Sequence, residues 1–137
     1  MREIKFRCWN EIDEKMYKVL QITFELIKDS EGFVYYEKIL STGERRAIAQ
    51  KLSDVILMQY IGLLDKQGKE IYEGDIVRYN GLYFEHGLYE IKFVNGSFIG
   101  INEKDELNFR KDFDFENVEV VGNIYENPEL LSLISYK

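Results

Sequence analysis

Apolar and polar residues alternate with a period of two along much of this chain, which is the pattern of β-strands. Residues 3–9 (EIKFRCW) alternate strictly, so we expect a strand with one face toward a core and the other toward water. Residues 15–26 continue in the same chemistry. The polar segment 10–14 between the two therefore predicts a hairpin.

Further strands are expected where β-branched and aromatic residues gather between turn residues. The run from Asp65 to Gly68 suits a type I turn, since Asp favours its first position and Gly its fourth. Asn95-Gly96 favours a type I′ turn, in which both central residues need a positive φ. The strands predicted in this way cover residues 32–40, 55–64, 70–72, 75–79, 89–94, 97–102 and 118–125.

Two segments point to short helices instead. Residues 43–56 contain two alanines and helix-tolerant charged residues, with Ile48 and Leu52 four residues apart, and a short helix is the prediction here. Asn127-Pro128 predicts the start of a terminal helix. Asn can cap a helix, and Pro at the first helical position lacks only an N–H that would be unpaired anyway.

The composition fits one compact domain over residues 1–137. Apolar residues make up 45% of the chain and aromatic residues 15%, which is enough to form a core in a chain of this length. Many short strands, tight turns and one or two short helices indicate a mainly β fold. The spacing of the turns suits a small barrel or sandwich.

The charge of the chain is uneven. Residues 1–53 hold ten Lys and Arg against nine Asp and Glu, giving +1, whereas residues 54–137 hold eight against sixteen, giving −8, and together these make the net charge of −7. Nucleic-acid binders need a basic surface for phosphate, so nucleic acid is not the expected partner. A local basic group, Arg45, Arg46 and Lys51, favours a solvated face, with phosphate contact as the alternative.

The single cysteine, Cys8, excludes an intrachain disulfide and lies in a strand pattern, so we expect it to be a buried structural residue. Residues 1–9 are too charged for a signal peptide. No apolar run is long enough to cross a bilayer. A cytoplasmic protein with no membrane partner is expected.

Three stretches, residues 2–16, 57–77 and 119–131, resemble the YopX family of phage and prophage proteins. The resemblance implies an SH3-like β-barrel over residues 57–137 with a C-terminal helix, and additional N-terminal β structure over residues 1–56. It also implies a phage accessory protein of unknown activity, without catalytic residues or a cofactor to carry over. The family usually has Thr where Ile61 stands, so any polar role of that Thr is lost.

The segment EGDIVRY (residues 73–79) raises the question of a ligand site. Turn chemistry accounts for each residue: Gly74 would adopt a conformation that other residues resist, Asp75 would bond turn amides, and Ile76 would enter the core. RNA contact is the alternative. It is opposed by the acidic residues nearby, Glu73, Asp75, Glu85 and Glu90.

Two further clusters could hold chemistry. Asp112, Asp114 and Glu116 would share one face of a strand, which is a solvated face by alternation and a metal site only if the carboxylates converge. His86 beside Glu85 is interpreted as an exposed loop histidine. An enzyme assembled from Asp75, His86 and the acidic strand is the weakest hypothesis, so catalytic residues, metal and cofactor are all predicted to be absent.

The aromatic residues exceed what a small barrel needs, and Tyr is enriched at protein interfaces. They lie either at contacts between chains, as in a homo-oligomer, or in the core under loops. The candidate binding residues are Tyr79, Tyr83, Tyr89, Arg45 and Arg46, with Tyr35, Tyr36 and Phe84 in the same aromatic group. The leading hypothesis is a protein that acts through contacts with a host or phage protein, and the alternative is a nucleic-acid-associated barrel module.

Overall fold

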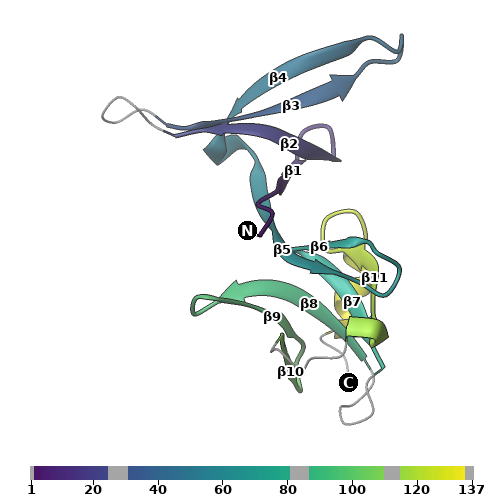
Figure 1. Cartoon of the computed structure of the whole chain (residues 1–137). Helices are drawn as coiled ribbons and strands as arrows, with labels where there is room; N and C mark the ends of the chain where they lie inside the picture. Colours follow the sequence, from purple (N-terminus) through teal and green to yellow (C-terminus); the bar gives the residue numbers. More distant parts are fainter. Residues whose placement is uncertain (1, 25–30, 81–86, 110–114, 135–137) are drawn as a thin grey trace. The chain divides into compact units, whose positions relative to one another are not determined.

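The computed structural model describes residues 2–24, 31–80, 87–109 and 115–134 (Figure 1). Its strands form two antiparallel sheets, one with the order β4-β3-β2-β1-β5-β6 and one with the order β10-β9-β8-β7-β11. The chain divides into two compact units. We call residues 4–59 the N-terminal unit and residues 60–137, together with 1–3, the C-terminal unit. The predicted division between residues 56 and 57 falls in the same strand, β5, in which the units meet along the chain.

The N-terminal unit is built from hairpins. The predicted hairpin is confirmed, because Arg7 of β1 pairs with Lys18 of β2 in an antiparallel ladder. The outer hairpin joins β3 to β4, and β1 also pairs with the first part of β5. The elements are β1 (Phe6–Asn10), β2 (Lys15–Thr23), β3 (Phe33–Ile39), β4 (Arg45–Lys51), the 3₁₀ turn η1 (Leu52–Asp54) and β5 (Ile56–Leu64).

The predicted helix over residues 43–56 is wrong, because Arg45–Lys51 form strand β4. All seven residues of β4 pair with β3, from Arg45 opposite Ile39 to Lys51 opposite Phe33. Helix propensity amounts to a few tenths of a kcal/mol for each residue, and a continuous ladder with a strand beside it outweighs that preference.

The core of the N-terminal unit is formed by the fully or nearly buried side chains of Cys8, Val34, Tyr36 and Val55. Tyr17 stacks on Tyr36 with ring centroids 4.3 Å apart, and stacking of this kind stabilises a pair of aromatic rings. The predicted burial of Cys8 is confirmed. Burial, followed by the nearby Asp13 carboxylate, raises the pKa of the thiol to about 11, so this cysteine stays a thiol at neutral pH.

Gly32, at the start of β3, leaves no room for a side chain. A Cβ there would lie 2.5 Å from the Thr23 carbonyl oxygen, a backbone atom of the neighbouring strand. We expect Gly32→Ala to lower the free energy of unfolding by about 1–3 kcal/mol, because β2 and β3 must move apart. Urea unfolding measures this. Gly87→Ala is the matched control, since its Cβ would meet nothing closer than 3.7 Å, and equal stability of the two variants would contradict the prediction.

The C-terminal unit holds the second sheet. Its core consists of buried side chains from β6, β7, β8, β10 and β11, including Ile71, Val77, Tyr89 and Leu107. Ile61, where the resemblance implies a Thr, packs against this core. The elements are β6 (Glu70–Tyr72), β7 (Asp75–Tyr79), β8 (Gly87–Val94), β9 (Ser97–Ile101), β10 (Glu106–Asn108), the 3₁₀ turn η2 (Phe115–Asn117), β11 (Val118–Asn123), the 3₁₀ turn η3 (Pro128–Leu130) and α1 (Leu131–Ile134).

Both predicted turns of this unit are confirmed. The N–H of Gly68 donates to the carbonyl of Asp65 at 3.0 Å. Asn95 and Gly96 have φ values of 51° and 82°, as a type I′ turn requires, and they join β8 to β9. The mainly β class is therefore confirmed, with two antiparallel sheets, while the SH3-like closure of the second sheet stays a prediction.

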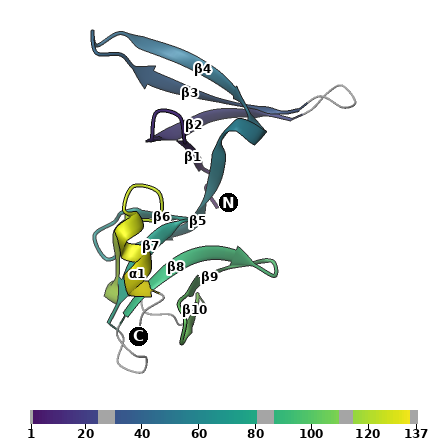
Figure 2. The ribbon, with the colours of Figure 1, turned by 180° about the vertical axis from the view of Figure 1, so that it is seen from behind.

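The predicted terminal helix is present but short. Pro128 occupies its first turn and α1 follows directly, packed against β8 (Figure 2). The prediction that Asn127 caps this helix is wrong, because its side chain makes no cap bond. Its Oδ1 instead accepts the N–H of Asn123 at 3.1 Å, which holds the end of β11 against the turn before the helix.

Candidate functional site

Gly74 and Asp75 form a turn of the fold. Gly74 has a φ of 83°, its N–H donates to the Ile91 carbonyl, and its carbonyl accepts the N–H of Ile124, both at 2.9 Å. Asp75 is 1% exposed, and its Oδ2 accepts the N–H of Tyr72 at 2.8 Å. The turn interpretation of Gly74 and Asp75 is confirmed, since these bonds account for the positive φ of Gly74 and the burial of the Asp75 carboxylate.

Asp65 has a second structural role, which the sequence pattern missed. Its Oδ1 accepts the N–H groups of Gln67 and Lys69 at 2.8 and 2.9 Å, within its own turn. Its Oδ2 accepts the N–H of Val120 at 2.9 Å, from strand β11. The two bonds within the turn are the usual behaviour of Asp at this position, whereas nothing in the local sequence identifies the bond to Val120.

The geometry explains the ionisation of Asp65. Burial opposes the charged form, but the backbone N–H groups of Val120, Lys69 and Gln67 outweigh it and hold the pKa of this carboxyl below its ordinary value. A carboxylate bonded to three amides is a fixed structural anion. It is a poor choice of general base, because three backbone amides already bond its oxygens and its proton affinity is low.

Stability should therefore depend on the ionisation of Asp65. Its pKa is lower in the folded chain than in the unfolded chain, so its contribution is complete above about pH 4 and is lost as the pH falls through the folded-state pKa. We expect the free energy of unfolding to fall more steeply below pH 4 in the wild type than in Asp65→Asn. Urea unfolding between about pH 2 and pH 7 measures the difference, and parallel profiles would exclude this role.

The contacts of these aspartates join the second and third of the stretches on which the family resemblance rests. Asp65 reaches Val120, and Gly74 accepts from Ile124. Asp75 also pairs with Asn123 in the ladder between β7 and β11. Asp65, Gly74 and Asp75 therefore have a structural role, in which they hold these two stretches together.

A polar network lies beside the core of the N-terminal unit. The side-chain amide of Asn10, which is buried, donates to Tyr36 Oη and to Gln50 Oε1, both at 3.1 Å. Tyr36 in turn donates to Gln50 Oε1 at 2.7 Å. The network thus joins the end of β1 to β3 and β4, and it fixes the inner face of the outer hairpin.

Asp13 continues the polar contacts at the turn between β1 and β2. Its Oδ2 accepts from Tyr17 Oη at 2.5 Å and from Lys38 Nζ at 3.2 Å. Burial opposes ionisation, but the bonds from Tyr17 and Lys38 outweigh it and lower the pKa of Asp13. Burial, and then the bond to Asp13, raises the pKa of Tyr17 well above its ordinary value. Tyr17 therefore keeps its proton and donates it to Asp13, and this hydrogen bond stabilises the turn between β1 and β2.

The tyrosines proposed for binding are placed differently by the structure. Tyr79 and Tyr89 are 4% and 1% exposed and belong to the core of the C-terminal unit, and Tyr36 belongs to the other core. Their burial favours the packing alternative over a contact between chains. Tyr35 is half-buried on β3, while Tyr83 and Phe84 lie outside the described residues.

The acidic strand predicted over residues 112–116 is only partly within the described residues. Phe115 and Glu116 belong to the 3₁₀ turn η2, so the predicted alternation does not extend to them. Asp112, Asp114 and His86 lie outside the described residues. Among the residues that the structure does describe, no three His, Cys, Asp or Glu side chains gather as a metal site would require.

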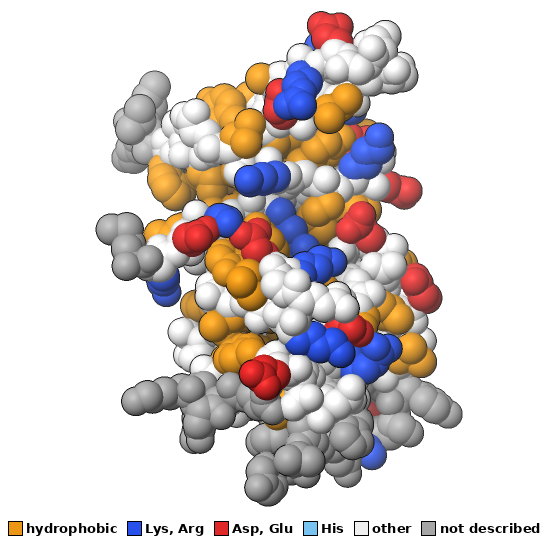
Figure 3. Space-filling model, turned by 45° about the vertical axis from the view of Figure 1, so that its right-hand side comes forward, with side chains coloured by type: hydrophobic (Ala, Val, Ile, Leu, Met, Phe, Trp, Pro, Cys, Tyr) orange, Lys and Arg blue, Asp and Glu red, His pale blue; other side chains and the backbone are white. Residues whose placement is uncertain are grey.

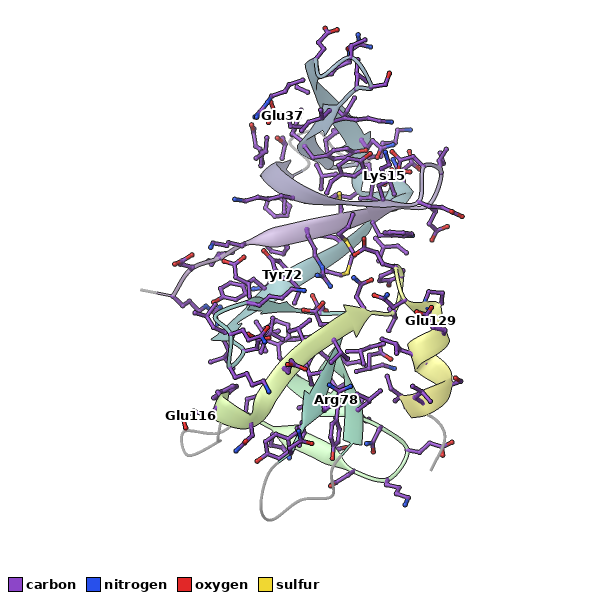
Figure 4. The ribbon with its side chains drawn as sticks, turned by 90° about the vertical axis from the view of Figure 1, so that its right-hand side faces the viewer. Lys15, Glu37, Tyr72, Arg78, Glu116 and Glu129 are labelled. Carbon is purple, nitrogen blue, oxygen red and sulfur yellow. The ribbon has the colours of Figure 1, made fainter. Side chains whose placement is uncertain are left out.

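The predicted basic group lies on β4 and is exposed. Strand alternation puts Arg45 and Lys51 on one face and Arg46 on the other. Arg45 lies 3.6 Å from Glu37, which projects outward from β3 (Figure 4), and Arg46 lies 4.0 Å from Glu44. The three basic side chains therefore lie on both faces of β4, two of them beside a glutamate, and they do not form one basic face.

The face that holds Arg45 is also apolar. Phe33, Tyr35 and Ile39 of β3 lie along it, with Glu37 between Tyr35 and Ile39, beside Ala47 and Ala49 of β4. Phe33 is 37% exposed and Ile39 is 62% exposed. In Figure 3, hydrophobic side chains reach the surface among Lys and Arg side chains over the part of the molecule drawn at the top. We call the face that carries Phe33, Tyr35, Ile39, Ala47 and Ala49 the outer face of the hairpin.

These elements define a mainly β protein of two antiparallel sheets. The two buried aspartates of its C-terminal unit, Asp65 and Asp75, stabilise the fold. The chain belongs to the YopX family: the family model described as YopX protein matches residues 5–132. The match therefore covers nearly all of both units of this chain.

Solved structures agree with this assignment. Protein EF1440 from Enterococcus faecalis is 28% identical, with a TM-score of 0.65, over 96% of this chain and 99% of that one. Protein yopX from Bacillus subtilis shares the fold at 22% identity, with a TM-score of 0.59, over 93% of this chain and 97% of that one. A search of curated proteins gave no match. In the parts of the chain that the structure describes, no helix has the length and apolar character needed to span a membrane.

Proposed function

We propose that this chain is a phage or prophage accessory protein that acts in the cytoplasm of a bacterial host through protein contacts, without chemistry of its own. The observation that supports the proposal is the outer face of the hairpin. It presents Phe33 and Ile39 to solvent, together with the half-buried Tyr35 and several charged residues, on a regular and well-paired sheet.

Exposed aromatic and aliphatic side chains on one continuous face favour a protein partner. Single exposed apolar residues are ordinary, but a contiguous group with a polar rim is typical of protein interaction sites. Here Phe33 and Tyr35 lie next to each other on the face, whereas the exposed ion pair of Glu37 with Arg45, 3.6 Å apart, separates Tyr35 from Ile39 and occupies one end of the face. A partner that covers Phe33 and Ile39 would release apolar surface from water, at roughly 25 cal/mol for each Å² covered.

The nucleic-acid alternative is supported only by the basic residues of β4. Their distribution over both faces of the strand opposes it, as does the net charge of −7. In the order of the sheet, β2 and β3 separate this strand from β1, which holds Arg7. A gel-shift series from low to physiological salt distinguishes the two functions, because phosphate binding is strongest at low salt.

The proposal is tested by affinity capture from bacterial lysate with mass spectrometry. The wild type is compared with the double variant Phe33→Asp/Ile39→Asp and with Leu133→Asp, which alters a residue of the C-terminal unit that is 56% exposed. We expect one or a few proteins to be recovered with the wild type and with Leu133→Asp, and to be lost with the double variant. Equal recovery with all three, or repeated recovery of no specific protein, would overturn the proposal.

A further inference from the structure

The outer edge of β4 has backbone groups available for a further strand. The N–H of Leu52 donates to the carbonyl of Gly32 at 2.9 Å, and the N–H of Leu40 donates to the carbonyl of Glu44 at 2.8 Å. Bonded and non-bonded pairs alternate along an antiparallel ladder, so the even-numbered residues of β4 bond to β3. The odd-numbered residues direct their N–H and C=O groups to the outer edge: Arg45, Ala47, Ala49 and Lys51.

The other strands at the ends of the two sheets, β6, β10 and β11, are short or covered. Strands β6 and β10 have three residues each. The outer edge of β11 is bonded by the turn at Asp65, because Val120 donates to the Asp65 carboxylate and the Val118 carbonyl accepts from Lys66. Short or covered edges are how proteins avoid unwanted pairing. Strand β4 has seven residues and lies at the end of its sheet (Figure 1).

The side chains on the outward-bonding residues select the partner. Ala47 and Ala49 are small and exposed, so they leave room for larger side chains on a strand laid against them. Arg45 and Lys51 stand at the two ends, with Arg46 on the opposite face. A segment that pairs along the whole strand therefore meets a cation at each end and two alanines between them.

A second copy of this chain fits this edge poorly. Antiparallel self-pairing over the full length of β4 would centre on Ile48 and place Arg45 opposite Lys51 of the other copy, twice. Like charges directly opposite each other destabilise a strand pair. The same two positions would attract carboxylates, and opposite charges across a strand pair contribute roughly 0.2–1 kcal/mol each.

We propose that β4 accepts an extended acidic segment of another protein as an additional antiparallel strand of its sheet. This inference rests on the proposed function of protein contacts and names the edge and the partner chemistry. The segment has about seven residues, in keeping with β4, with Asp or Glu near both ends and apolar residues opposite Ala47 and Ala49. The ion pair of Arg45 with Glu37 at 3.6 Å is exposed and therefore weak, so Arg45 can turn to the incoming carboxylate.

Proline substitutions in β4 should have opposite effects at residues whose N–H points outward and at residues whose N–H points toward β3. Ala47→Pro removes an N–H that points outward, which leaves the ladder between β3 and β4 intact. We expect this variant to fold and to bind an acidic strand at least tenfold more weakly than the wild type. Ala47→Ser keeps the N–H and is expected to bind as the wild type does. Ile48→Pro removes an inward N–H, so it is expected to unfold the hairpin.

The experiment is an NMR titration of the ¹⁵N-labelled chain with two capped peptides, ETVTVTE and KTVTVTK, up to millimolar concentration. Supporting results are shifts centred on the amides of Ala47 and Ala49 with the acidic peptide, at least tenfold weaker binding of the basic one, and loss of binding in Ala47→Pro. Shifts centred elsewhere, equal binding of both peptides, or no shifts with the acidic peptide would overturn the inference. Sedimentation that shows a dimer abolished by Ala47→Pro would overturn it too, in favour of self-pairing.

Failure of this inference can be distinguished from failure of the proposed function. If affinity capture recovers the same partner with the wild type and with Ala47→Pro, the chain acts through protein contacts but does not use the edge of β4. If capture recovers no specific partner while the acidic peptide binds at Ala47 and Ala49, the edge is competent and the proposed function is wrong.

Discussion

Replacing Asp65 with alanine should lower the free energy of unfolding by about 3–4 kcal/mol, the largest loss that we expect from any single polar side chain among the described residues. Three backbone N–H groups, those of Gln67, Lys69 and Val120, would lose a charged acceptor at once. Hydrogen bonds to charged groups contribute about 1.5–3 kcal/mol each, and the three are not additive because they share one carboxylate. Urea unfolding followed by circular dichroism measures the loss.

Two further variants make the Asp65 experiment specific. Asp65→Asn keeps the shape but replaces one acceptor oxygen with a donor, so its stability should fall between that of the wild type and that of Asp65→Ala. Glu129→Ala alters an exposed side chain of the same unit (Figure 4) and should change the stability by less than about 0.5 kcal/mol. A loss for Asp65→Ala no larger than that for Glu129→Ala would show that the turn and β11 hold together without the carboxylate.

Asp75→Ala is the second large effect, with an expected loss of about 2–3 kcal/mol. The side chain is 1% exposed, and its removal leaves the N–H of Tyr72 without its acceptor in the turn that leads into β7. The neighbouring Gly74 keeps its bonds to Ile91 and Ile124, so the strands should still assemble at low denaturant.

Asp75→Ala also separates architecture from function. We expect the folded fraction of this variant to bind the protein recovered by affinity capture as tightly as the wild type does. Binding is measured well below the denaturation midpoint, so that the comparison concerns folded chains only. Unchanged stability together with a lost partner would mean that Asp75 is a binding residue and that the turn interpretation is wrong.

The candidate surface could be predicted from the sequence only in part. Arg45 and Arg46 stand out as a local basic group in an acidic chain, and both lie on β4, the strand that forms the proposed edge. That this edge is a strand could not be seen, because two alanines among charged residues favour a helix by local propensity. The ladder of seven pairs with β3 decides the matter, and it also determines which backbone groups face outward.

The aromatic residues show the same limit. Tyr79 and Tyr89 lie in stretches of alternating apolar and polar residues, 75–79 and 89–94, which predicts strands but does not say which face of each strand is covered. In the fold both rings enter the core of the C-terminal unit, whereas Phe33 and Tyr35 share a face of β3 that the described residues leave partly exposed. Which face of a strand is covered depends on the elements that pack against it, and these are distant in the sequence.

Local chemistry accounts for what the sequence established: the mainly β class, the Asn95-Gly96 hairpin, the turn at Asp65, the positive φ of Gly74 and the burial of Cys8. Each follows from the conformational preference of a few adjacent residues or from period-two alternation. The structure adds the strand at β4, the hydrogen bond from the Val120 N–H to Asp65, and the hydrogen bond from the Asn123 N–H to the side chain of Asn127. These features join residues that only folding brings together, because a hydrogen bond across 55 positions leaves no trace in local pattern or propensity.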